Sequence, residues 1–319
     1  MPDAIAIGEL LIDFVPTVSG VTLIEAPAFI KAPGGAPANV AVGLARLGVS
    51  SGFLGQVGDE AFGHFLAQTL RDNGVDVSHL KYSSAARTML AFVSLHADGE
   101  REFMFYRHPS ADMLYHPEDV DPEYVRTARI LHFGSISLIG EPSRSATLRA
   151  ISIALAAGAL ISFDPNLRLD LWSDAEAARE GIRIGWPLAH VVKIGEEELR
   201  FIANADDTAE AARAVWHPGL RLMIVTGGAR GSRYITPTFA GDVAGFKVEP
   251  VDTTGAGDGF VAGLLKGLLD HPDAFGDEAQ LRAICRYANA VGALTTTRRG
   301  AIPALPTANQ VDEFLRHAR

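Results

Sequence analysis

A single aspartate, Asp258, lies inside a glycine turn at residues 252–260, DTTGAGDGF, directly before the apolar run VAGLLKGLL. Gly255 and Gly257 permit a tight turn whose backbone N–H groups converge, and the helix predicted to follow adds its own free N–H groups and the positive end of its dipole. Such a place binds anions. An ionised aspartate beside a phosphoryl group held there can accept a proton from an attacking hydroxyl. Helix capping uses the same residue types, so this stretch alone leaves both interpretations open.

A second glycine element, PGGAPANVAVGLARLG at residues 33–48, places Gly34 and Gly35 before a predicted helix. In a binding site, the backbone at Gly35 would approach a ligand closely, and Asn39 would direct its amide at ligand hydroxyls. A loop-to-helix junction with a buried capping asparagine would use the same residues. The stretch therefore marks a candidate site without deciding its use.

Polar residues also follow two predicted strands. Asp13 comes after the first apolar run, ELLIDF, where a strand of a parallel sheet would end, and DPNLR at residues 164–168 follows another strand. Open α/β sheets bind ligands at the carboxyl ends of their strands. There the Asp13 carboxylate could accept two hydrogen bonds from a sugar, and Arg168, in a turn pinned by Pro165, could bridge sugar oxygens and a transferring phosphate. A turn-forming aspartate and a surface arginine are the alternatives.

The stretch TGGARGS at residues 226–232 follows a further predicted strand. Its small residues would leave room for a nucleotide, although a plain turn would use them too. The sequence has no GxxxxGK[ST] loop, no HExxH pair and no GxSxG elbow, and Phe260 stands where GxGxxG needs its third glycine. A dinucleotide-binding dehydrogenase, a zinc site and a nucleophilic serine therefore lack their main support in the sequence.

These candidate residues need a scaffold, and the sequence alternates short apolar runs with longer helical patterns. This alternation predicts an α/β fold with a mostly parallel sheet covered by helices on both faces. The predicted strands are AIAIGE, RILHFGS, ALISFD, HVVKI and LMIVTG, and the predicted helices cover residues 38–47, 143–157, 174–184, 196–203, 257–269 and 278–296. In one of these helices, Phe260, Leu264 and Leu268 recur every four residues, which indicates a buried face.

Two segments, at about residues 15–32 and 86–108, break this pattern. The second has two strand-like runs around a turn at Asp98 and Gly99, which predicts a small β appendage. One face of its second run carries Phe103, Phe105 and Arg107, and the other carries Met104 and Tyr106. A lid over the ligand that also meets a second subunit would explain apolar residues on both faces, and a surface hairpin is the alternative. The simplest organisation is one domain over residues 1–319 with these two segments as its lid.

Composition and charge limit the kinds of molecule that the protein is expected to bind. The 319 residues carry 28 Lys and Arg against 38 Asp and Glu, a formal net charge of −10, and no basic cluster is dense enough to follow a nucleic-acid backbone. The single cysteine, Cys285, excludes a disulfide framework and a Cys-based zinc site. No apolar stretch reaches the length of a membrane span, and the N-terminus shows no cleavage signal. These features predict a cytoplasmic protein with no nucleic-acid or membrane partner.

In this order, the stretches resemble the ribokinase-like (PfkB-type) family of carbohydrate kinases over nearly the whole chain. Both family signatures are present, the early PGGAPANVAVGLARLG and the late DTTGAGDGFVAGLL. Within the family, the stretches most similar to fructokinases are GELLIDFVP, GEREFMFYRHPSADML, FDPNLRLDLW, VVKIGEEEL and ALTTTRRGAIPALPT. The resemblance implies a three-layer α/β sandwich with a mostly parallel central sheet and a small β lid, which phosphorylates the primary hydroxyl of D-fructose with ATP and Mg²⁺. A kinase of 2-keto-3-deoxygluconate, another sugar or a nucleoside, and a non-catalytic sugar sensor, are the alternatives.

The resemblance also implies roles for individual residues. Asp258 is the expected general base, and the backbone of Gly255, Ala256 and Gly257 is the expected anion hole. The positions that hold the sugar in similar kinases are matched by Asp13, Gly34, Gly35, Asn39, Arg107 and Arg168, with Arg107 arriving from the lid. The positions that hold the nucleotide are matched by Thr226, Gly228, Gly231 and Asn289. A homodimer that forms through the lid is also expected.

Two ions are implied beside the nucleotide. Potassium would bind next to the anion hole, mainly through backbone carbonyls, at Asp252, Thr254, Thr295, Arg298, Gly300 and Ala304. Many relatives carry an Asn-x-x-Glu motif near magnesium, but this chain reads GEEE, with Gly195 where the asparagine would stand. Glu198 keeps the acidic position and is the expected outer-shell magnesium partner. Lys193 is the candidate replacement for the missing asparagine.

Overall fold

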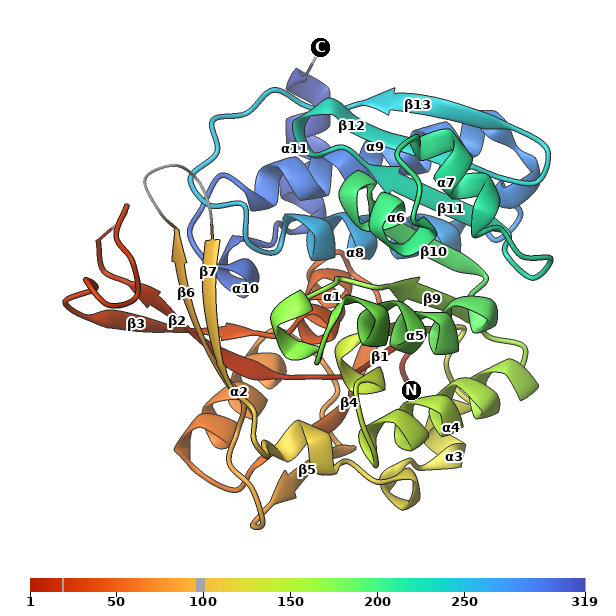
Figure 1. Ribbon diagram of the computed structural model, residues 1–319. Helices are drawn as coiled ribbons and strands as arrows, with labels where there is room; N and C mark the ends of the chain where they lie inside the picture. The colour runs from red at the N-terminus through yellow and green to blue at the C-terminus, as the bar shows by residue number, and fades with distance from the viewer. Residues whose placement is uncertain (19, 96–100, 319) are drawn as a thin grey trace.

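A nine-stranded sheet forms the middle layer of the protein in a computed structural model that describes residues 1–18, 20–95 and 101–318 (Figure 1). Its strands are β1 (Ala4–Ile7), β4 (Ser51–Gly58), β5 (Leu80–Ser83), β8 (Ile130–Gly134), β9 (Leu160–Asp164), β10 (Val191–Gly195), β11 (Leu222–Thr226), β12 (Gly231–Ile235) and β13 (Ala240–Ala244). The order across the sheet is β13-β12-β11-β10-β9-β8-β1-β4-β5. The pairs from β11 to β5 are parallel, and β12 and β13 are added antiparallel at one edge.

Helices cover both faces of this sheet (Figure 1). Side chains alternate between the faces along each strand, so Ile5 and Ile7 of β1 face one helical layer while Ala4 and Ala6 face the other. One layer contains α3 (Pro122–Val125), α4 (Ser143–Ala156), α5 (Ala175–Gly185), α6 (Glu196–Ala203) and α7 (Thr208–Ala214). The other contains α1 (Ala36–Arg46), α2 (Ala61–Asp72), α8 (Ala256–Asp270), α9 (Glu278–Thr295), α10 (Ala301–Ala304) and α11 (Ala308–His317). None of the described helices has the length and apolar character that crossing a bilayer requires.

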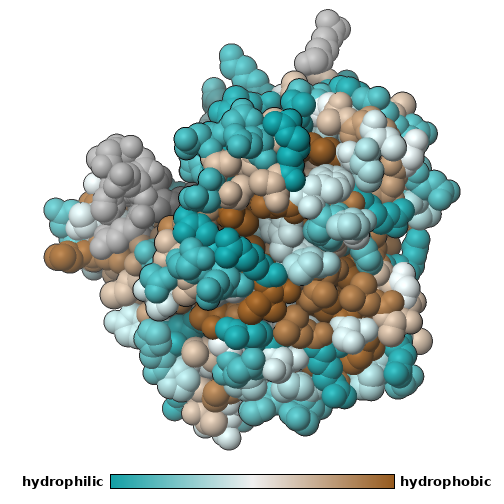
Figure 2. Space-filling model, turned by 45° about the vertical axis from the view of Figure 1, so that its right-hand side comes forward, coloured by the Kyte–Doolittle hydropathy of each residue, from teal (hydrophilic) through white to brown (hydrophobic). Residues whose placement is uncertain are grey.

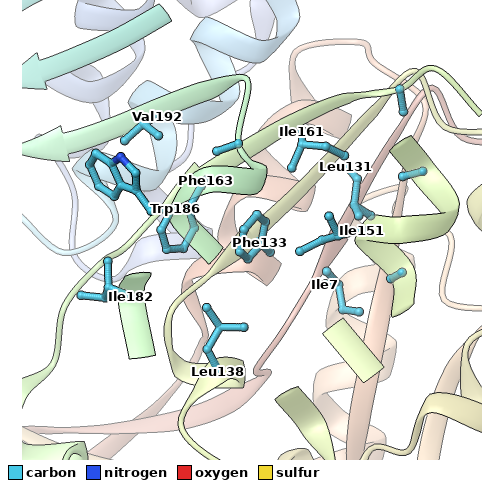
Figure 3. Close-up of a cluster of buried hydrophobic side chains, with 14 of the residues drawn as sticks. Ile7, Leu131, Phe133, Leu138, Ile151, Ile161, Phe163, Ile182, Trp186 and Val192 are labelled. Atoms are coloured by element: carbon cyan, nitrogen blue, oxygen red, sulfur yellow. The ribbon is translucent and has the colours of Figure 1, made fainter. Parts of the chain in front are cut away.

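The core on each face comes from the residues that the patterns single out. Figure 3 shows large side chains from neighbouring strands packed together, among them Phe133 and Phe163, whose rings stack with centroids 4.5 Å apart. On the opposite face, Phe260, Leu264 and Leu268 of α8 are buried, as their spacing predicts. Because parallel strands are covered on both faces, their sequences are continuously apolar, which is why the strand predictions match the structure.

The sequence patterns do not identify β4 and α2, nor the antiparallel pair β12 and β13. All eight residues of β4 are buried, but glycines interrupt its apolar run. A side chain at Gly55 would place its Cβ 2.5 Å from the carbonyl oxygen of Gly8, and one at Gly52 would lie 2.1 Å from the Tyr124 hydroxyl. Close packing therefore requires glycine here and removes the β-branched residues by which a strand is usually predicted.

A second sheet of four strands lies beside the main one (Figure 1). In spatial order it contains β3 (Phe29–Gly34), β2 (Leu11–Pro16), β6 (Leu90–Leu95) and β7 (Arg101–Tyr106). The expectation that Asp13 ends a strand of the parallel sheet is wrong: the main-sheet strand β1 stops at Ile7, and Asp13 lies inside β2 of the second sheet. Gly8 and its two successors separate the two strands, and the apolar run ELLIDF conceals this break. The turn predicted at Asp98 and Gly99 lies outside the described residues.

Hydrophobic side chains remain exposed on this second sheet and on the turn next to it, and brown atoms are visible on the projecting part of the molecule in Figure 2. They include Val15 (40% exposed) and Ile30 (59%), which pair across β2 and β3. On the opposite face of the sheet, Met104 and Tyr106 are also exposed. The single chain therefore leaves apolar surface uncovered on both faces of the small sheet.

Candidate active site

The carboxylate of Asp258 lies in the first turn of α8, with 7% of the residue exposed. The helix begins after Gly255, whose left-handed backbone (φ +78°) a glycine adopts without strain. A side chain at Gly255 would also place its Cβ 2.6 Å from the Cβ of Ala301. Because glycine has no side chain with which to cap the first turn, this helix terminus is suited to an anion.

Two amides hold the Asp258 carboxylate from different elements. Asn39 of α1 donates from Nδ2 to Oδ2 at 2.8 Å, and Asn166, in the loop after β9, donates from Nδ2 to Oδ1 at 3.4 Å. Burial raises the pKa of Asp258 to about 6, against the opposing effect of the Asn39 hydrogen bond. The nearby carboxylate of Asp164 raises this pKa further, and the cations of Lys193 and Arg168 lower it. The carboxylate is thus largely ionised at neutral pH and is a stronger base than an ordinary aspartate.

Asp13 and the glycine pair of the early signature lie next to each other. A side chain at Gly34 would place its Cβ 2.2 Å from Oδ2 of Asp13, so only glycine leaves room for this carboxylate. Gly35 has a φ of +108°, and its Cβ would lie 2.4 Å from the carbonyl oxygen of Glu9. Burial raises the pKa of Asp13 to about 7, Arg168 lowers it, and the carboxylate of Asp258 raises it. Asp13, Arg168 and Asp258 therefore influence one another electrostatically although they come from three separate parts of the chain.

The two predicted sugar-binding arginines lie in different surroundings. The guanidinium of Arg168 lies 5.8 Å from the ring centre of Phe103 on the small sheet, and its Nη1 donates to the carbonyl oxygen of Leu167 at 3.0 Å. Arg107 follows β7 and is 4% exposed. Its Nε donates to Asp112 at 2.9 Å in a buried ion pair. Arg168 is therefore grouped with Asp13 and Asp258, whereas Arg107 is held at the base of the small sheet.

A known protein family matches nearly the whole chain. Residues 1–308 match the family described as pfkB family carbohydrate kinase.

The chain belongs to the pfkB family of carbohydrate kinases. It is a sugar kinase, an enzyme that transfers a phosphoryl group. Fructokinase-2 of Solanum lycopersicum is 53% identical over 315 residues, which cover 98% of this chain and 95% of that relative. Fructokinase with bound ATP from Xylella fastidiosa has a crystal structure with a TM-score of 0.89 and 36% identity, covering 99% of both chains. The crystal structure of fructokinase from Vibrio cholerae O395, in a form with bound fructose, ADP and calcium ion, has a TM-score of 0.88 and 38% identity, and the match covers 98% of this chain and 99% of that chain.

These similarities confirm the predicted fold class of the pfkB kinase. The main sheet is mostly parallel and lies between two helical layers, and a separate small sheet lies beside it, as the ribokinase-like resemblance implies.

A buried lysine of this kinase lies behind the glycine turn. Lys193 of β10 donates from Nζ to Oδ2 of Asp164 at 2.9 Å, and a Cβ at Gly257 would lie 2.9 Å from the same Nζ. Burial lowers the pKa of Lys193, but the carboxylates of Asp164 and Glu198 outweigh it and raise the pKa above its usual value. A fixed positive charge thus adjoins the turn through the space that glycine leaves open. This charge and the N-terminus of α8 fit the phosphates of a nucleotide.

Glu198, the expected magnesium partner, binds backbone groups with both of its carboxylate oxygens. Oε1 accepts from the N–H of Leu167 at 2.7 Å, and Oε2 accepts from the N–H of Gly195 at 2.9 Å. The first contact reaches the loop after β9, and the second caps the start of α6. Its role toward magnesium stays a prediction.

The residues predicted for the nucleotide lie around β11 and β13. Thr226 ends β11, and Gly228 (φ +60°) faces open space. Gly231 lies against β13, since its Cβ would come within 2.1 Å of the carbonyl oxygen of Val243. Asn289 of α9 donates to this same carbonyl at 3.1 Å. Gly231 and Asn289 therefore hold β13 in place, and nucleotide contact remains an expectation for all four residues.

The predicted potassium residues come from two loops that the structure joins. Oδ1 of Asp252 accepts from the N–H of Thr254 at 2.9 Å, and Oδ2 accepts from the N–H of Gly300 at 2.9 Å. Thr295 is fully buried at the end of α9, and Ala304 is buried at the end of α10. Arg298 is exposed in the loop between these helices. Among the described residues, no group of three or more His, Cys, Asp or Glu side chains is arranged for a metal, and the potassium site stays a prediction.

Sequence reasoning did not assign three residues that the structure links to the site. Asn166 donates to Asp258, Asp164 pairs with Lys193, and Glu9 accepts from the N–H of Ala36 at the start of α1. The stretch DPNLR contained a signal for the first two, because an aspartate and an asparagine on either side of a proline at a strand end often form a structured turn. Glu9 gave no such signal, since it lies in an apolar run.

Proposed function

We propose that this kinase transfers the γ-phosphoryl group of ATP to the primary hydroxyl of D-fructose and produces fructose 6-phosphate. The fructokinases to which the chain is similar support this choice of substrates. The observation that carries the proposal is the Asp258 carboxylate, buried at the N-terminus of α8 and held by Asn39 and Asn166. A base in this position can remove a proton from a hydroxyl while the helix terminus faces the group being transferred.

In this proposal, Asp258 accepts the proton of the primary hydroxyl, and its pKa of about 6 keeps it ionised at neutral pH. The backbone N–H groups from Gly255 to Gly257 face the phosphoryl group, and Lys193 adds a positive charge behind them. ATP supplies the phosphoryl group. The chain contributes position and charge, which is the main source of catalysis in phosphoryl transfer.

We propose that the sugar binds between the two sheets. Asp13 and Arg168 would bind its hydroxyls, the glycines of the early signature would allow close approach, and Arg107 would act from the base of the small sheet. Residues 1–319 would then be one kinase domain, with the segments at about 15–32 and 86–108 as its lid. Closure of the lid would exclude water from the reacting groups.

We further propose Mg²⁺ as the ion that accompanies ATP and K⁺ as an activating ion at the loops of Asp252 and Gly300. The Vibrio cholerae O395 fructokinase binds a calcium ion together with fructose and ADP, which supports a metal ion in the reaction of this kinase. Replacing K⁺ with Na⁺ or tetramethylammonium at constant Mg²⁺ should lower kcat if the loops bind K⁺. An unchanged kcat would contradict the potassium site without affecting the assignment of Asp258.

A homodimer that forms through the lid is proposed because Val15 and Ile30 remain exposed on its sheet. Full burial of an exposed side chain of this size is favourable by about 1.5 to 3 kcal/mol, so covering the exposed part of Val15 and Ile30 contributes about 0.6 to 1.8 kcal/mol each. Light scattering should give twice the chain mass for the native protein and a lower mass for Ile30→Lys, and a native mass of one chain would contradict it. A cytoplasmic location is proposed as well, since the buried thiol of Cys285 is free.

The central experiment combines a variant with a panel of substrates. Asp258→Asn should lower kcat by about 100-fold or more while sugar binding is largely retained, because only the proton acceptor is lost. ADP release should be measured with fructose, 2-keto-3-deoxygluconate and a nucleoside. Near-normal turnover by Asp258→Asn would reject the base. Saturation by another substrate, with fructose inactive, would reject the choice of sugar, and sugar binding without turnover of ATP would indicate a sensor.

A further inference from the structure

The loop after β9 carries two groups of the proposed site and has an unusual backbone. Asn166 donates to Asp258, and Arg168 lies near both Asp13 and Asp258. Asn166 has a φ of +44°, in the left-handed region that residues other than glycine seldom adopt. Such a conformation persists only where the surrounding contacts hold it.

In addition to the bonds that the Arg168 side chain donates to the carbonyls of Asn166 and Leu167, three contacts hold the backbone of this loop. The carboxylate of Asp164 accepts from the N–H of Asn166 at 3.1 Å, and the N–H of Ser135 donates to the carbonyl of Pro165 at 3.3 Å. The third and shortest contact is from the N–H of Leu167 to Oε1 of Glu198 at 2.7 Å. Glu198 is the most distant in sequence of the three and lies on α6, which follows a different strand. A charged acceptor at this distance forms one of the stronger hydrogen bonds in proteins.

The other oxygen of Glu198 fixes it to its own helix. Oε2 accepts from the N–H of Gly195, the residue that precedes α6. A Cβ at position 195 would lie 3.1 Å from this oxygen, which is closer than the usual contact. Glycine at 195 therefore lets the carboxylate lie against the backbone and face Leu167.

We infer that Glu198 is a positioning residue for the sugar, which holds the loop of Asn166 and Arg168 in its binding conformation through the N–H of Leu167. The inference rests on the proposed function, because it assigns this loop to the sugar. It also explains the departure of the chain from the Asn-x-x-Glu pattern, since Gly195 and Glu198 form one unit. Glu198 then affects the sugar side of the reaction, through a backbone contact, in addition to any effect on the nucleotide side.

The test compares Glu198→Gln with Glu197→Gln, the same change at the exposed neighbouring position. Glutamine has one acceptor oxygen, so it can keep one of the two N–H contacts and loses the charge. Fructose binding should be measured by calorimetry without nucleotide or Mg²⁺. We expect the Kd for fructose to rise by about 10- to 100-fold in Glu198→Gln and to stay unchanged in Glu197→Gln.

Hydrogen exchange of the free protein supplies a second measurement that needs no sugar. The amides of residues 166–168 should exchange faster in Glu198→Gln than in the native protein, and Gly195→Ala should show a smaller change in the same direction. An unchanged Kd for fructose with an altered Mg²⁺ or ATP requirement would overturn the inference. A lower Tm with unchanged exchange at residues 166–168 would also overturn the inference, because Glu198 would then only cap α6.

The experiments distinguish a failure of the inference about Glu198 from a failure of the proposed function. If the native protein does not bind fructose, the proposed substrate is wrong, and calorimetry is repeated with the substrate that the panel identifies. The exchange experiment still decides whether Glu198 holds the loop. If fructose binds to the native protein and to Glu198→Gln with equal Kd, the inference fails while the proposed function stands.

Discussion

Removing the Asn39 amide should shift the pH at which the kinase becomes active. Asn39 donates to Oδ2 of Asp258 at 2.8 Å, and this bond stabilises the ionised carboxylate. In Asn39→Ala the carboxylate loses the donor while its burial persists, so its pKa should rise. Alanine is the strongest helix former, and position 39 lies inside α1, so the helix itself should be retained.

The size of the shift follows from the energy of the lost bond. A hydrogen bond to a charged group contributes about 1.5 to 3 kcal/mol, and one pKa unit corresponds to about 1.4 kcal/mol. The pKa of Asp258 should therefore rise from about 6 by about one to two units. In the proposed mechanism the ionised form of Asp258 is the base, so kcat/KM should rise with pH through this pKa in both proteins, but at higher pH in the variant.

The assay is the pH dependence of kcat/KM for the sugar, measured by ADP release from about pH 5 to 9. The control is Asn309→Ala, the same substitution at an exposed position of α11, which should leave the profile unchanged. The variant should approach native activity at the alkaline end if Asn39 acts through the base alone. If the pH midpoint of the kcat/KM profile moves by less than about half a pH unit in Asn39→Ala, Asn39 does not stabilise the ionised Asp258 as assigned, whatever the maximal rate of the variant.

Three further predictions concern neighbouring residues. Gly35→Ala should lower the free energy of unfolding by about 1 to 3 kcal/mol and raise the KM for the sugar, because the backbone φ is +108° and the new Cβ would lie 2.4 Å from the Glu9 carbonyl oxygen. Thermal unfolding measures the change in stability, and steady-state kinetics measures the change in KM. Burial raises the pKa of Glu9 from 4.5 to about 7. The contribution of Glu9 to the free energy of unfolding is therefore complete below pH 4.5 and is lost, by up to about 3 kcal/mol, as the pH rises through 7. Urea unfolding at a series of pH values should show a smaller loss of stability in Glu9→Gln than in the native protein. Gly257→Ala should lower kcat, because its Cβ would lie 2.9 Å from Nζ of Lys193 and would occupy the space that adjoins the turn. Steady-state kinetics measures this effect, and a normal kcat would contradict the anion hole.

The sequence allows the scaffold of the site to be predicted where periodicity and composition agree. The parallel strands are buried on both faces and therefore read as apolar runs, and Phe260, Leu264 and Leu268 show the helical spacing of α8. The glycine turn before Asp258 could also be predicted, because its residue types are required by the backbone itself.

Contacts between distant parts of the chain could not be predicted. The bond from Asn166 to Asp258 joins residues 92 positions apart, and the bond from Asn39 joins residues 219 positions apart, so neither leaves a local pattern. The predicted position of Asp13 was wrong because an apolar run does not show where a chain leaves one sheet and enters another. The burial that raises the pKa of Glu9 likewise depends on elements far along the chain.

The short connection between β1 and β2 determines how far different residues of the small sheet can move when the sheet rotates. Only three residues separate Ile7 of the main sheet from Leu11 of the small one, so any rotation of the small sheet has its pivot close to this point. At about 3.3 Å per residue, Asp13 lies about 7 Å along β2 and Pro16 about 17 Å. A swing of the sheet therefore displaces the outer end more than twice as far as it displaces Asp13. Asp13 therefore lies on the part of the small sheet that moves least, and a sugar hydroxyl bound to it, as proposed, would keep this contact while the outer end of the sheet moves away.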